Sequence, residues 1–152
     1  MRDKLVKTAL RYLGVSSVPY QGRLKGKSSE TGFDCSGFVT FVLEQCAFPI
    51  PDTIRRSYEY FDRFGVFIHE EICDAGDLVF FSYHGLRPQH IGIMTSRDEF
   101  IHAPGKRNSH VKISKIRHRP IKRKKEGYIY VKNPIGFKRL TIRNGKYHEI
   151  CI

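Results

Sequence analysis

Residues 33–46 read FDCSGFVTFVLEQC, a segment that is apolar almost all round once its first few residues are passed. Such a segment predicts a buried helix, and Pro49 and Pro51 end it. Cys35 stands where the helix begins, so the positive end of the helix dipole and the first backbone N–H groups can stabilise a thiolate. We therefore identify Cys35 as a candidate nucleophile beside N–H groups suited to an oxyanion hole.

The residues around this segment predict two further helices. Asp3 is a candidate N-cap and Gly14 a natural stop for a first amphipathic helix. Its predicted buried face comprises Val6, Ala9, Leu10 and Leu13. Residues 14–32 are rich in Gly, Ser and Lys and predict a surface loop. After Pro51, Asp52 or Thr53 can cap another helix. Its predicted apolar side comprises Ile54, Tyr58 and Phe61.

Short strands follow Gly76. The predicted strands are residues 77–81, 90–94, 99–103 and 111–116, with 128–132 and a hairpin over 139–150 around Asn144-Gly145 beyond them. Helices first and a meander of strands afterwards indicate an α+β fold. The length of 152 residues suits one domain, residues 1–152.

Two histidines in these strands can complete a thiol site. A cysteine nucleophile needs a base, and the base needs a polar group that orients its ring. His90 opens one strand and His102 lies near the end of the next, so adjacent antiparallel strands place the two rings side by side. A single His in a strand is more often structural, but the combination with Cys35 favours catalysis. The structural interpretation applies to the others, His69, His84, His110, His118 and His148.

Five ordered blocks now carry a family resemblance. They are PY at 19–20, FDCSGFV at 33–39, AGDLVFF at 75–81, HIGI at 90–93 and FIHA at 100–103. Together they resemble the signature blocks of the NlpC-type cell-wall endopeptidases over about residues 4–116. The resemblance implies a papain-like α+β fold with N-terminal helices packed on a mostly antiparallel sheet, and it leaves residues 117–152 as a basic strand extension.

The resemblance also implies a reaction and roles for residues. The reaction is hydrolysis of peptidoglycan stem peptides, typically between γ-D-glutamate and the diamino acid. Cys35 corresponds to the nucleophile, His90 to the base and His102 to the third member of the triad.

Three further residues match positions near the substrate. Tyr20 corresponds to a tyrosine beside the nucleophile that can contact the substrate or the oxyanion, with a packing role as the alternative. Asp34 and Ser36 correspond to residues that help line the substrate site. The family often has Gly-Gly after the tyrosine and an arginine after the proline that follows the nucleophile helix. Here Gln21-Gly22 and Pro51-Asp52 stand instead, which bears on substrate preference.

Charge is unevenly distributed. Residues 1–103 hold 12 Lys/Arg against 13 Asp/Glu, whereas residues 104–152 hold 15 against 2. Residues 115–125, KIRHRPIKRKK, form the densest run. It fits electrostatic attachment to an anionic cell-wall polymer, with nonspecific nucleic-acid binding as a less favoured alternative and a solvated loop as a third.

Other classes of chemistry lack their motifs. There is no G-x-S-x-G, H-E-x-x-H, phosphate-binding glycine loop or C-x-x-C pair, so we expect neither a cofactor nor a metal. Cys46 is expected to pack as a small apolar residue. A papain-like acyltransferase remains an alternative within the same fold. No apolar run suits a membrane span and no secretory signal is visible, so the protein acts inside the cell or its leader was removed.

Overall fold

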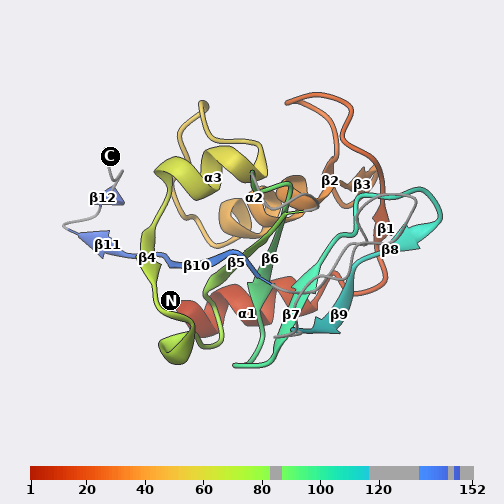
Figure 1. Cartoon of the computed structure of the whole chain (residues 1–152). Coiled ribbons are helices and arrows are strands. Elements are labelled where there is room, and N and C mark those ends of the chain that lie inside the picture. The colour runs from red at the N-terminus through yellow and green to blue at the C-terminus, as the bar shows by residue number, and fades with distance from the viewer. Residues whose placement is uncertain (83–86, 117–133, 144–145, 148–152) are drawn as a thin grey trace.

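The computed structural model describes residues 1–82, 87–116, 134–143 and 146–147 (Figure 1). The helices are α1 (Arg2–Leu10), α2 (Cys35–Gln45), α3 (Ser57–Arg63) and the 3-10 turn η1 (Glu70–Ile72). Within the described residues, no helix combines the length and the apolarity that crossing a membrane requires.

The strands form one large sheet and two small ones. The large sheet runs β4 (Val66–Ile68), β10 (Gly136–Arg139), β5 (Leu78–Phe81), β6 (His90–Met94), β7 (Glu99–His102) and β9 (Lys112–Lys115), with every neighbouring pair antiparallel. A second sheet runs β2 (Lys27–Ser28), β3 (Gly32–Phe33), β1 (Ser16–Ser17) and β8 (Ser109–His110). The last pair is β11 (Ile142–Arg143) and β12 (Lys146–Tyr147).

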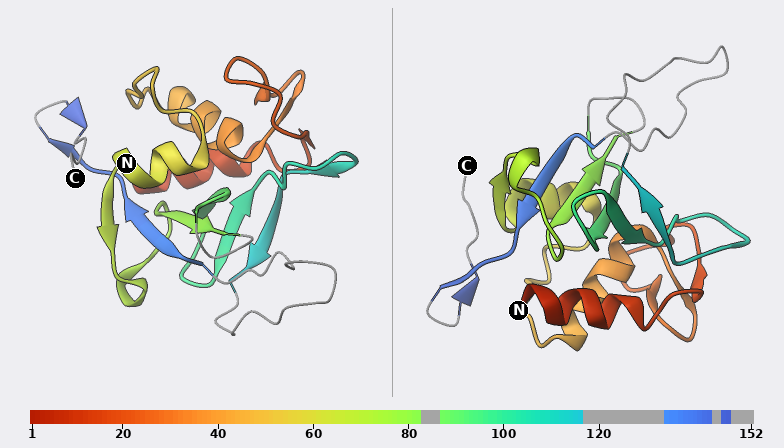
Figure 2. Two further views of the ribbon diagram at one scale, coloured as in Figure 1. Left: turned by 45° about the horizontal axis from the view of Figure 1, so that its top comes forward. Right: turned by 90° about the horizontal axis from the view of Figure 1, so that it is seen from below.

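The three α-helices lie on one face of the large sheet (Figure 2). Alternate residues of the central strands, such as Phe80, Ile91 and Ile93, are fully buried in one cluster with Val39 and Val42 of α2. This alternation is what a sheet with one helix-covered face requires. The predicted α+β architecture and the four central strands are confirmed.

The predicted buried face of α1 was right at Ala9 and wrong at Leu10 and Leu13. The helix buries Leu5, Thr8 and Ala9, whereas Leu10 and Leu13 are 37% and 45% exposed. Its N-cap is Met1, not Asp3. The helix ends at Leu10, so a pattern that counted Leu13 as helical rotated the apolar stripe onto the solvent side.

The start of α3 was also predicted too early. The helix begins at Ser57 rather than after Asp52 or Thr53, because the Glu59 carboxylate accepts hydrogen bonds from the backbone N–H of Arg56 at 2.9 Å and of Arg55 at 3.3 Å. These bonds satisfy N–H groups that have no partner inside a helix.

Strand β10 was not predicted, and buried charges hold it in place. Arg139 donates two hydrogen bonds of 2.9 Å to the buried carboxylate of Asp77 on the β5 side. Lys138 donates to the carbonyls of Tyr60 at 3.2 Å and Phe61 at 2.7 Å in the last turn of α3, where a cation suits the helix dipole. Charged side chains such as Lys138 and Arg139 are typical of solvent-exposed segments, so the sequence did not predict a strand here.

The C-terminal predictions have mixed outcomes. Strands β11 and β12 pair antiparallel on either side of positions 144–145, which confirms the expected hairpin over residues 142–147, whereas Arg139 belongs to β10. The predicted strand 128–132 and most of the basic run, residues 117–125, lie outside the described residues.

Candidate active site

Cys35 is the first residue of α2, and the preceding loop is closed tightly against it. The Asp34 carboxylate caps the helix by accepting the backbone N–H of Gly37 at 2.7 Å. A Cβ at Gly37 would overlap the carbonyl of Gly26, so this approach requires glycine. The half-buried Cys35 Sγ lies 3.8 Å from the carbonyl oxygen of Gln89, beside the backbone of His90.

The surroundings of the sulfur favour the neutral thiol. Burial, followed by the nearby Asp34 carboxylate, raises the pKa of the Cys35 thiol to about 11, although backbone N–H groups of Ser36 and Ile91 and the charge of Arg55 oppose this. We expected the helix N-terminus to stabilise a thiolate, but desolvation outweighs that effect here. The Cys35 thiol is therefore protonated in this setting, and it must lose its proton before or as it acts as a nucleophile.

Two histidines and a serine form a buried row behind the sulfur. The Nε2 atom of His90 lies 2.7 Å from Nδ1 of His102, and Nε2 of His102 lies 2.9 Å from the Oγ atom of Ser114 on β9. All three residues are buried, and the rings of Phe81 and Phe100 pack against the imidazoles. The structure thus brings the predicted histidines together, while the thiol makes its hydrogen bond to Gln89 rather than to an imidazole.

His90 is electrically neutral in this setting. Burial, with a smaller contribution from the Lys106 charge, lowers the pKa of His90 to about 3. A neutral imidazole has a ring nitrogen that can accept a proton, which is the property that general-base catalysis requires.

A second buried cluster surrounds the residues on either side of Cys35. Arg55 donates to both carboxylate oxygens of Asp34, at 3.0 and 2.6 Å, and to the Ser36 hydroxyl at 2.8 Å. It also donates to the carbonyls of Arg23 and Lys25. Arg55 is only 3% exposed, so this ion pair is screened from water and fixes the start of α2.

The predicted substrate-site residues occupy different environments. Asp34 and Ser36 are buried and hydrogen bonded to Arg55, so they position the helix start in this structure. Tyr20 is 38% exposed, and the guanidinium carbons of Arg56 and Arg55 lie 4.3 and 5.5 Å from the centre of its ring.

Sequence reasoning missed Arg55 and Ser114. The arginine expected directly after the proline is absent, yet Arg55 stands four residues after Pro51 and reaches Asp34. The available signal was the position of Arg55 in the sequence, close to the predicted start of the helix that follows the Cys35 helix. Ser114 had a weaker signal: it lies in a predicted strand next to that of His102, but nothing local distinguishes it from a surface serine.

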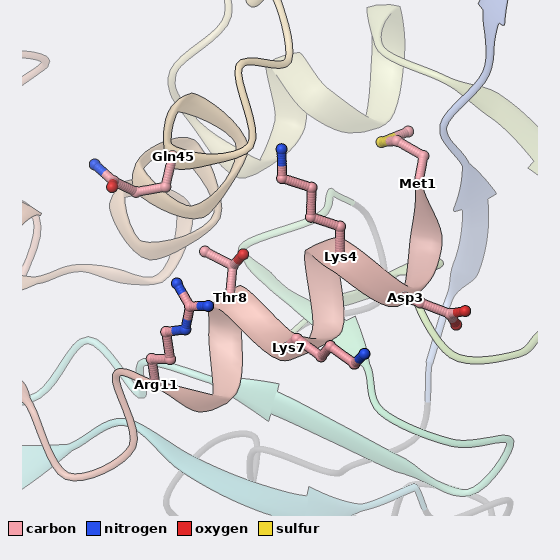
Figure 3. Close-up of a pocket in the computed structure, with 7 residues that line it drawn as sticks. All are labelled: Met1, Asp3, Lys4, Lys7, Thr8, Arg11 and Gln45. Carbon is pink, nitrogen blue, oxygen red and sulfur yellow. The ribbon is translucent and has the colours of Figure 1, made fainter.

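Two hollows lie away from Cys35. One, of about 460 Å³, is lined by α1 and by Gln45 at the far end of α2; Lys4, Lys7 and Arg11 give it a basic rim (Figure 3). The other, of about 610 Å³, lies along α2 beside Arg23, Leu24 and Glu44. Among the described residues no group of three or more His, Cys, Asp or Glu side chains could hold a metal ion.

The comparisons with known proteins identify the family of the chain. The model of the NlpC/P60 family matches residues 18–129. The chain is 36% identical over 93 residues to the bifunctional muramidase/DL-endopeptidase CwlT of Bacillus subtilis, covering 60% of this chain and 26% of that protein. It is 35% identical over 88 residues to the murein DD-endopeptidase MepH of Escherichia coli, covering 57% and 31%.

A solved structure gives the same result. The chain superposes on an NlpC/P60 family protein from Bacillus cereus with a TM-score of 0.70 and 27% identity, covering 91% of this chain and 40% of that one. The chain thus spans about a quarter to two fifths of the length of these three relatives. Since the family model covers most of the chain, this protein belongs to the NlpC/P60 family.

Proposed function

We propose that this chain is a cysteine endopeptidase that hydrolyses peptidoglycan stem peptides through Cys35, His90 and His102. The observation that carries the proposal is the buried row of His90, His102 and Ser114 beside the N-terminus of α2. Membership of the family and the names of two relatives, a DL-endopeptidase and a murein DD-endopeptidase, support the substrate class.

The mechanism begins with proton transfer. His90 accepts the thiol proton of Cys35 as the sulfur attacks the scissile carbonyl carbon, and a thioester forms. His90 then protonates the departing amine, and water attacks the thioester to release the acid. Backbone N–H groups at the start of α2 are suited to binding the oxyanion.

The row behind His90 can accommodate the tautomer that this mechanism needs. His90 must donate its Nε2 proton to His102 Nδ1 so that its Nδ1 can accept a proton from the thiol. That arrangement leaves the His102 proton on Nε2, where it donates to Ser114 Oγ at 2.9 Å. The hydroxyl therefore completes the hydrogen bonding of the productive tautomer by accepting from His102.

We further propose that the scissile bond joins γ-D-glutamate to the diamino acid. The DL-endopeptidase name of one relative supports this choice, whereas the DD-endopeptidase name of another gives a competing bond to test. Transfer of the acyl group to an amine acceptor is the alternative outcome of the same thioester.

The basic C-terminal segment is proposed to hold the enzyme near anionic cell-wall polymer. The support is charge alone, 15 Lys/Arg against 2 Asp/Glu over residues 104–152. Salt-dependent binding to purified cell wall, exceeding binding to DNA at equal salt, is the expected result; stronger binding to DNA contradicts it.

Mass spectrometry of the products from defined stem peptides tests the reaction. The purified chain is expected to release a peptide ending in γ-D-glutamate, with water and not added amine as the acceptor. The Cys35→Ala variant is expected to release none while keeping its fold by circular dichroism. A variant that cuts at the original rate refutes the assignment of Cys35.

A further inference from the structure

Two arginines near the candidate site, Arg56 and Arg87, differ from the neighbouring arginines because no carboxylate of the described residues pairs with them. The neighbours that are ion paired are Arg23 and Arg63 on Glu59, and Arg55 on Asp34. Arg56 and Arg87 are exposed, and neither forms an ion pair with a carboxylate of the described residues. Their two positive charges are therefore available to a ligand.

Tyrosine rings hold both guanidinium groups. The guanidinium carbon of Arg56 lies 4.3 Å from the centre of the Tyr20 ring and 5.5 Å from that of Tyr58, and that of Arg87 lies 3.8 Å from the Tyr58 ring. We call these four residues the arginine–tyrosine row. A guanidinium stacked on a ring keeps its N–H edge available for a bidentate acceptor and loses less freedom when that acceptor binds.

One end of the arginine–tyrosine row lies close to Cys35 along the segment that leads into β6. Arg87 comes two residues before Gln89, whose carbonyl oxygen lies 3.8 Å from Cys35 Sγ. Ser57, between Arg56 and Tyr58 in sequence, donates its hydroxyl to the Pro88 carbonyl at 3.5 Å, so the start of α3 is held against the same segment.

The other end of the arginine–tyrosine row connects through Arg55 to the start of α2. Arg55 lies 5.5 Å from the Tyr20 ring and binds Asp34, the residue directly before Cys35. Both ends of the row therefore connect to residues adjacent to the nucleophile, which places two uncompensated cations within reach of a bound peptide of a few residues.

We propose that the arginine–tyrosine row binds a carboxylate of the peptide substrate. The inference rests on the proposed function. A planar carboxylate matches the edge of a guanidinium, and two positive charges without acidic neighbours favour an anion. A γ-linked glutamyl residue leaves its α-carboxylate unsubstituted on the acyl side of the scissile bond. The other source of this chemistry is the carboxylate of the amine-side residue.

Peptide binding to the Cys35→Ala chain separates this inference from the reaction. Three stem peptides are compared by calorimetry: one with both carboxylates, one with the acyl-side α-carboxamide and one with the amine-side carboxamide. The test variant adds Arg56→Gln and Arg87→Gln. The matched control adds Arg11→Gln and Arg97→Gln, which removes the same charge from exposed positions outside the row.

The expected result is about 10–100-fold weaker binding of one carboxamide peptide to the parent, and the peptide affected identifies the carboxylate. The test variant is expected to bind all three equally, and the control to keep the preference. Equal binding by the parent, no binding by it, or a preference retained without Arg56 and Arg87 overturns the inference. A chain that binds with this preference but whose Cys35 form releases no product instead overturns the proposed reaction.

Discussion

Two buried polar clusters flank Cys35, and they differ in charge. On the sheet side, His90, His102 and Ser114 form a row in which His90 is neutral because burial lowers its pKa to about 3. On the helix side, Arg55 and Asp34 form an ion pair that is almost wholly shielded from water. In both clusters the buried polar groups have partners, but the sheet-side cluster uses hydrogen bonds to a neutral imidazole and the helix-side cluster uses an ion pair.

The difference separates proton movement from positioning. The sheet-side row presents a neutral imidazole, so it can accept the thiol proton during attack and return it to the departing amine. The helix-side pair joins the Arg55 guanidinium to the Asp34 carboxylate, which also caps α2. Its contribution is to fix the sulfur in place. Variants that remove one residue from either cluster test whether proton transfer and positioning are separate in this way.

Replacing the base is expected to have the largest effect. His90→Gln removes the proposed acceptor of the thiol proton, so kcat should fall about 10³-fold or more while the free energy of unfolding changes little. Peptide cleavage and urea unfolding measure the two quantities. A variant with near-normal kcat contradicts the role of the sheet-side row, whereas an unfolded variant is replaced by His90→Asn.

Breaking the helix-side pair is expected to act mainly on stability. Arg55→Met leaves the Asp34 carboxylate buried without its cation, which should cost about 3–5 kcal/mol of unfolding free energy. Arg63→Met removes an exposed partner of Glu59 and serves as the control, with a loss below about 1 kcal/mol. Equal losses in the two variants contradict the contrast between buried and exposed pairs.

The neutrality of His90 predicts how stability depends on pH. Because burial lowers the folded-state pKa of His90, the unfolded chain binds a proton that the folded chain does not below pH 6.5. Stability from this group is intact above pH 6.5 and falls by about 1.4 kcal/mol per pH unit below it, until about pH 3. Urea unfolding at pH 6.5 and 4.5, with His90→Gln as the reference, measures this. An equal pH dependence of the two chains contradicts the buried neutral state.

The smallest effect on kcat is expected at Ser114, the last residue of the sheet-side row. Ser114→Ala removes the acceptor for the His102 Nε2 proton, so kcat should fall about 10-fold with KM unchanged, and Ser114→Thr should restore it. Nitrogen NMR of the His102 ring should show a shift of the proton from Nε2 toward Nδ1 in the alanine variant. An unaltered tautomer, or no rescue by threonine, shows that the hydroxyl serves packing only.

The helix-side and sheet-side clusters also differ in how far the sequence predicts them. The position of Cys35 at a helix start follows from local apolar pattern, and the pairing of His90 with His102 follows from two adjacent strands. Both depend on neighbours in sequence or on the simplest strand connection, which is why the central strands β5, β6, β7 and β9 were predicted.

The contacts that were missed join distant segments. Arg55 is 21 residues from Asp34, and nothing nearby distinguishes an arginine that becomes buried from one that stays in solvent, as Arg56 next to it does. Strand β10 inserts between β4 and β5 from far along the chain, held by the pairing of Arg139 with Asp77. A charged strand is identified only when its partner charges are known.

The central claim is that the Cys35 sulfur carries the acyl group of the substrate during turnover. The most direct measurement is the mass of the intact chain after rapid acid quench with a stem peptide, followed by peptide mapping. The account predicts a mass gain equal to the acyl fragment, located on Cys35 and reduced in His90→Gln. Turnover with the acyl group on another residue, or with no adduct even when deacylation is slowed, would contradict it.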